Sequence, residues 1–186
     1  MISNIVETLQ KNLGYPSLQK VNPNSQEVKE DTSRSSAEKL AQSAITAVLA
    51  ALVKFTRSDR GADYLLTYDR EENWLKLIYE AKQPEAVEKV AHYSNTPLQV
   101  AADQMQKIAG ESVKLIHQSV GDKPTAEKIK TYMNGQRHNI LLYLPAAMQM
   151  GDLLNDDSLD DRTNKMEGPI SNMMHAIENK LSGGGS

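Results

Sequence analysis

The hydrophobic pattern is densest between residues 36 and 55, SAEKLAQSAITAVLAALVKF. From residue 43 to residue 53 the only polar side chains are Ser43 and Thr46. A helix that is apolar on all sides is buried either in a protein core or in a membrane. A membrane span needs about 20 apolar residues, and this run has roughly half that length, between charged flanks. The pattern therefore predicts a buried central helix over about residues 36–56, and no membrane span. Ser35, with Glu38 three residues later, is a capping-box pattern that predicts where this helix begins.

Apolar residues recur at helical spacing along the rest of the chain. We expect short helices beginning near Ala62 and after a cap at Asp69, a helix opened by Pro84, and a longer one opened by Thr96 and Pro97. The longer helix carries a predicted apolar stripe of Leu98, Ala101, Ala102, Met105, Ile108 and Ala109. No segment alternates as a strand does. The predicted fold class is therefore all-α, a multi-helix bundle around the central helix.

Three further features mark helix ends and bends in the second half of the chain. Asn134-Gly135 is expected to end a helix over residues 124–133. Pro145 interrupts the second apolar run, residues 140–150, and is expected to bend it. A last amphipathic helix is predicted from Gly168-Pro169 to Leu181.

The N-terminus carries an apolar stripe that we treat as a candidate interaction surface. It predicts an amphipathic helix over residues 2–13, through Ile2, Ile5, Val6, Leu9 and Leu13. Residues 17–34 are polar and indicate a linker, which divides the chain into residues 1–34, a helical domain at 35–181, and a flexible tail at 182–186. A helix this short is marginal alone. Its stripe must be covered by its own domain, by a second copy, or by another protein.

Composition narrows the function classes. The chain has 186 residues and no cysteine, which excludes disulfides, thiolate metal sites and cysteine nucleophiles. Lys and Arg number 21 against 24 Asp and Glu, so the net charge of −3 draws the protein to neither nucleic acid nor anionic lipid. The N-terminus lacks the basic and apolar regions of a secretory signal. We therefore expect a cytoplasmic protein.

The sharpest metal candidates are two weak pairs on separate predicted helices. Glu88 and His92 are four residues apart and share one helix face; His175 and Glu178 are three apart on the last helix. Helical di-iron proteins use Glu-x-x-His on two helices and a Glu from each of two others. Here the spacing differs in one pair and the order is reversed in the other. We therefore expect surface pairs, with no metal and no cofactor.

Two charged runs are further candidates, one for a calcium loop and one for nucleic-acid binding. Asp156, Asp157, Asp160 and Asp161 lack the alternating frame of a calcium loop, which predicts a solvated acidic loop. The best basic run contains Lys123, Lys128, Lys130, Arg137 and His138, with Tyr132 as a residue that can stack on a base. Charge runs are usually solvated helix faces, and the net charge is negative. We therefore expect no nucleic-acid binding.

Part of the chain resembles a known family. The stretch SSAEKLAQSAITAVLAALVKFTRSDRGADYLL combines an alanine-rich apolar helix, a turn with Ser58 and Gly61, and a Leu65-Leu66 pair. With NILLYLPAAMQMGDLL and its Leu-Pro step, it is similar to the bacterial YidB-like family, helical proteins of unassigned function, over roughly residues 35–155. ITAVLAAL and LPAAMQMG can also be laid over each other, so two pseudo-repeated halves are an alternative organisation.

No pattern of residues in the chain indicates a catalytic site. The nucleophile elbow G-x-S-x-G is absent, and the only glycine run lies in the tail. The expected function is a non-enzymatic helical interaction or scaffold protein, acting with a protein partner or as a homo-oligomer. The alternative is a small apolar-ligand-binding protein, since Met- and Ala-lined helical bundles can hold pockets.

Overall fold

The computed structural model describes residues 3–21, 33–67 and 69–159, and within these ranges the chain is helical and has no strand. The elements are α1 (Ile5–Asn12), α2 (Ser36–Phe55), α3 (Asp59–Tyr64), α4 (Trp74–Tyr79), η1 (Glu80–Lys82), α5 (Gln83–Ser94), α6 (Leu98–Val120), α7 (Ala126–Leu141), η2 (Ala146–Met148), α8 (Met150–Leu154) and η3 (Asp157–Leu159). The predicted all-α class is confirmed.

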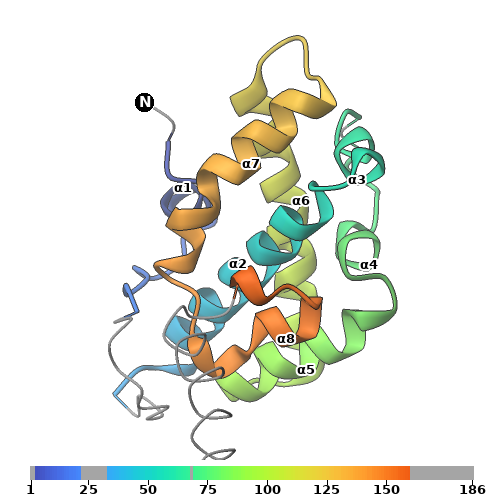
Figure 1. Ribbon diagram of the computed structural model, residues 1–186. Coiled ribbons are helices and arrows are strands. Elements are labelled where there is room, and N and C mark those ends of the chain that lie inside the picture. The colour runs from blue at the N-terminus through green and yellow to red at the C-terminus, as the bar shows by residue number, and fades with distance from the viewer. Residues whose placement is uncertain (1–2, 22–32, 68, 160–186) are drawn as a thin grey trace, which may run out of the picture.

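Helix α2 is the axis of the bundle, as the hydrophobic pattern predicted. Ser35 and Glu38 form the expected capping box, in which each side chain bonds the other residue's backbone N–H. Every residue from 40 to 53 is buried, and α1, α4, α5, α6, α7 and α8 pack around the helix (Figure 1). The many alanines leave room for these neighbours to approach closely.

The same helix meets the length and composition needed to cross a membrane. It has 20 residues and a mean hydropathy of 1.2 over an 18-residue window, of which 78% is buried among the other helices. Its apolar surface is therefore already covered by protein, and no other described helix meets the same criteria.

The N-terminal stripe is covered by the chain's own domain. Ile5, Val6 and Leu9 are at most 1% exposed and belong to the one hydrophobic core, where α1 packs against α2, α6 and α7. Leu13 is half-buried against that core, and Ile2 lies outside the described residues. The predicted boundary at residue 34 therefore does not separate two cores, and the three buried side chains are not exposed to a partner.

Two buried glutamines attach this N-terminal region to the bundle. The Gln136 side chain accepts the Ile5 N–H at 3.1 Å and donates to the Ser3 carbonyl at 2.8 Å. The Gln42 side chain accepts the Gln19 N–H at 2.9 Å and donates to the carbonyls of Gln19 and Tyr143. Both amides are about 1% exposed or less, so they satisfy backbone groups that the core would otherwise leave unpaired.

Two predicted helix ends in the second half are wrong. Helix α7 continues through Asn134 and Gly135 to Leu141, because Ile129, Met133, Gln136 and Ile140 lie on one buried face and packing outweighs the ~1 kcal/mol penalty of a glycine. The helix then ends before Pro145 instead of bending there. Residues 144–151 span η2 and the start of α8, so this run does not match the continuous helix of ITAVLAAL.

Helix starts also differ from the prediction by a few residues. Helix α3 begins at Asp59, capped by Ser58, and Asn73 caps α4 in place of Asp69. The Asp69 carbonyl instead accepts the Trp74 Nε1–H at 2.9 Å. Pro84 lies in the first turn of α5 as expected, and α6 begins one residue late with Pro97 as its N-cap. The predicted helix at 168–181 and the tail lie outside the described residues.

Candidate functional site

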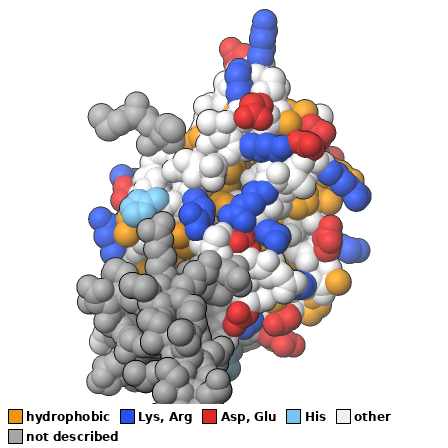
Figure 2. Space-filling model, in the orientation of Figure 1, with side chains coloured by type: hydrophobic (Ala, Val, Ile, Leu, Met, Phe, Trp, Pro, Cys, Tyr) orange, Lys and Arg blue, Asp and Glu red, His pale blue; other side chains and the backbone are white. Residues whose placement is uncertain are grey.

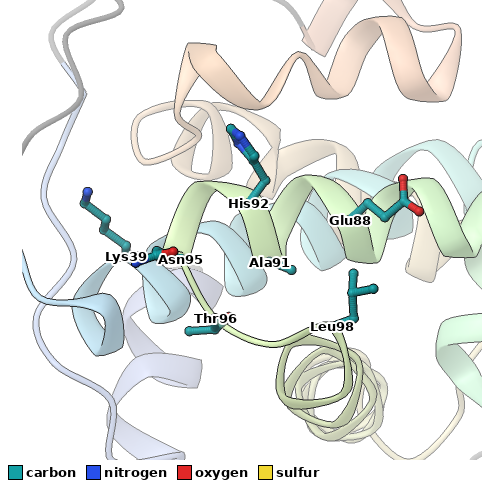
Figure 3. Close-up of a pocket in the computed structure, with 7 residues that line it drawn as sticks. All are labelled: Lys39, Glu88, Ala91, His92, Asn95, Thr96 and Leu98. Atoms are coloured by element: carbon teal, nitrogen blue, oxygen red, sulfur yellow. The ribbon is translucent and has the colours of Figure 1, made fainter.

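An open hollow lies where α5 ends and α6 begins, beside the first turn of α2 (Figure 3). Asn95, which ends α5 in the left-handed conformation (φ 53°), turns the chain between the two helices. The hollow has a volume of about 580 Å³ and is lined by Lys39, Glu88, Ala91, His92, Asn95, Thr96 and Leu98. Most of these side chains are polar or charged, so the hollow is a wet surface feature.

The predicted pair Glu88 and His92 lies in this hollow, where the two residues belong to the same helix, α5. The two side chains leave α5 in different directions, and the Lys39 ammonium lies on the opposite side from Glu88 (Figure 3). No group of three or more His, Cys, Asp or Glu side chains that could hold a metal occurs among the described residues. His175 and Glu178 lie outside those residues.

Leu98 is the residue that sequence reasoning placed wrongly. The predicted stripe put it in the core with Ala101 and Met105, yet it is 55% exposed, while those two are fully buried. The reason is its position as the first residue of α6, directly after the Pro97 N-cap, where the helix has not yet reached the core. That position was readable from the sequence, because proline fixes the start of the helix.

The predicted acidic loop is not uniformly solvated. Asp156 is only 7% exposed and pairs with the Arg57 guanidinium. Burial by itself raises the pKa of Asp156. Hydrogen bonds from Ser158 and the charges of Arg57 and Lys54 outweigh that effect and hold the pKa below its ordinary value. Asp160 and Asp161 lie outside the described residues.

The predicted basic run is divided among separate contacts. Lys130 pairs with Asp59 of α3, which lowers the pKa of Asp59 and raises that of Lys130. Lys128 donates to the Lys123 carbonyl at 2.8 Å, and Arg137 donates to the Ser158 carbonyl. Lys and Arg side chains gather near the middle of the face on which α7 and α8 lie (Figure 2). Several of these cations thus serve contacts within the fold.

Known proteins give no further assignment. Comparisons of the chain with models of known families, with curated proteins and with solved structures found no match, so the resemblance to the YidB-like family has no support beyond the sequence pattern.

Proposed function

We propose that this chain is a non-enzymatic, cytoplasmic interaction protein that binds a second copy of itself through the α5–α6 hollow. The observation that carries the proposal is the exposure of Leu98 in a hollow that also contains side chains of opposite charge, Lys39 and Glu88. Interfaces combine an apolar centre with a polar rim. Leu98 and Ala91 supply the apolar part here, and Lys39, Glu88 and His92 supply the rim.

The charges of the rim suit a twofold partner. Lys39 lies at one side of the hollow and Glu88 at the other (Figure 3). A twofold axis in the plane of the contact brings residue i of one copy against residue j of the other, and j against i. Lys39 of each copy would then face Glu88 of its partner, and Leu98 of each copy would be buried in the contact. Such complementarity fixes register and favours encounter.

One observation supports a non-enzymatic role, and a second bears on the alternative of an apolar-ligand pocket. His92 and Glu88 do not converge, so the hollow offers no pair within hydrogen-bond reach for general acid–base chemistry. Ala91 and Leu98 are the only apolar side chains among the seven that line it, so the alternative of an apolar-ligand pocket gains no support from this hollow.

Analytical ultracentrifugation of the full chain over a concentration series tests the proposal. We expect wild-type protein to dimerise as its concentration rises. Leu98→Glu should abolish dimerisation, because it places a charge at the apolar centre of the contact. Tyr64→Glu is the matched control, since Tyr64 is also a large exposed side chain, 42% exposed, but lies on α3.

Charge reversal tests the pairing itself. Lys39→Glu and Glu88→Lys should each weaken dimerisation, because like charges then face each other, and the double variant should restore it. A wild-type chain that stays monomeric at every concentration contradicts self-association. If the double variant does not dimerise again, the twofold arrangement is contradicted.

A further inference from the structure

The segment of residues 150–159, formed by α8 and η3, is attached to the bundle by buried apolar side chains and by four positively charged side chains. Arg57 pairs with the Asp156 carboxylate and donates to Ser158 Oγ at 3.0 Å. Lys54 donates to the Asn155 carbonyl at 3.4 Å. Lys82 and Arg137 donate to the carbonyls of Leu153 and Ser158. Lys54 lies on α2, Arg57 in the turn after α2, Lys82 in η1 and Arg137 on α7, so separate parts of the fold hold one short segment.

The segment also has its own internal hydrogen bonds. The Asp156 N–H donates to the Gly151 carbonyl at 2.8 Å, and the Leu159 N–H donates to the Asp156 carbonyl at 2.9 Å. The Asp156 carboxylate accepts from the backbone N–H and hydroxyl of Ser158, at 3.1 and 2.5 Å. These bonds all lie within the segment, and because isolated helices this short are marginal in water, they persist only while the segment is docked against the bundle.

Backbone conformation marks both ends of α8. Gln149, just before it, has φ 47° and Asn155, just after it, has φ 51°. Asparagine adopts this left-handed conformation readily at a helix end, whereas glutamine does so at a cost in free energy that persists only where the surroundings hold it. Gln149 is exposed and joins η2 to α8. Release of the segment would relax Gln149.

We propose that residues 150–159 open as a separate unit, held closed by Lys54, Arg57, Lys82 and Arg137, and that opening uncovers the C-terminal turns of α2 without unfolding the bundle. Burial of Leu153, Leu154 and Leu159, each at most 7% exposed, opposes opening. The contacts of the four cations add to this burial, so loss of one of them should make opening more frequent. The depressed pKa of Asp156 agrees with a carboxylate that is stabilised in the closed state.

Native-state hydrogen exchange on the full chain tests this. In Arg57→Met the amides of Asp156 and Leu159 should exchange about tenfold or more faster, since hydrogen bonds to charged groups are the stronger ones. The amides of Ile45 and Leu49, in the centre of α2, should keep their wild-type rates. Lys130→Met is the matched control, because it removes a cation that is paired with the exposed carboxylate of Asp59 outside the segment. It should leave the exchange rates of all four amides unchanged.

A second measurement does not depend on any variant. Salt screens charge pairs, with a Debye length of about 10 Å at 0.1 M and 3 Å at 1 M. Raising sodium chloride from 0.1 to 1 M should accelerate exchange at Asp156 and Leu159 and leave Ile45 and Leu49 unchanged. Equal acceleration at all four amides would overturn the proposal, because the segment would then open only with the whole domain. No acceleration at Asp156 and Leu159 in either experiment would overturn it as well.

Discussion

Two glycines inside helices differ in the space around them: Gly61 has no room for a side chain, and Gly110 has ample room. A Cβ added to Gly61 would lie 1.9 Å from the Phe55 carbonyl oxygen, because α3 starts against the end of α2. A Cβ added to Gly110, inside α6, would meet nothing within 4 Å. The sequence indicated a turn at Gly61. The structure shows that the first glycine is required by a close backbone approach and that the second leaves α6 continuous.

Alanine substitutions at these two glycines should therefore change stability in opposite directions. Gly61→Ala should lower the free energy of unfolding by about 1–3 kcal/mol, because backbone must move to relieve the overlap. Gly110→Ala should raise it by about 0.5–1 kcal/mol, since alanine loses less conformational entropy in a helix. Urea denaturation measures both. Equal effects of the two substitutions would contradict the close approach of α3 to α2.

At the scale of elements, α1 shows how much of the bundle depends on tertiary contacts. Its apolar stripe was predictable from the spacing of the apolar residues. The sequence did not show whether the stripe packs against its own domain, a second copy or another protein. The structure selects the chain's own core, and the reason lies in Gln136, a polar residue whose burial no pattern predicted. Its amide meets the backbone of α1 where α7 and α1 pack together. Sequence periodicity is consistent with Gln136 on the buried face of α7, but it cannot identify Ser3 and Ile5 as its partners, because they are more than 130 residues away.

Deletion of residues 1–16 should consequently destabilise the domain. Burial of Ile5, Val6 and Leu9 contributes up to about 1.5–3 kcal/mol each, as an upper bound. The truncated chain should melt at a lower temperature and bind more of a dye that reports exposed apolar surface. Its dimerisation through the α5–α6 hollow should persist at temperatures where it is folded. An unchanged melting temperature together with lost dimerisation would contradict the burial of α1 and assign the contact to the N-terminal stripe.

At the scale of the whole molecule, the buried Tyr79 makes the stability of the fold decrease at alkaline pH. The Tyr79 hydroxyl donates to the Ala47 carbonyl at 2.7 Å, in the middle of α2, and its burial raises the pKa of Tyr79. An unfolded tyrosine has a pKa of about 10. Because the pKa of Tyr79 is higher in the folded than in the unfolded protein, Tyr79 contributes to the free energy of unfolding. That contribution is complete below about pH 10 and is lost as the pH rises further.

The substitution Tyr79→Phe separates the effect of the hydrogen bond to Ala47 from the effect of ionisation of Tyr79. At pH 7 it should lower the free energy of unfolding by about 0.5–1.5 kcal/mol, the usual worth of one hydrogen bond. Between pH 7 and pH 11 it should lose less stability than wild type, because one ionising group is absent. Urea denaturation at both pH values measures the difference, with Tyr64→Phe as the exposed control. A pH dependence identical to that of wild type would exclude Tyr79 as a source of the alkaline loss.

The sequence by itself determined the all-α class, the buried helix α2 and its capping box, because local spacing and capping chemistry act within a few residues. It did not place the turn at residues 142–149, the continuation of α7 through Asn134 and Gly135, or the docking of α1. Only the tertiary structure decided those, since each depends on which distant surface packs against the segment. The same reason explains the surface contacts: Arg57 and Asp156 are 99 residues apart, and only the fold brings such charges together.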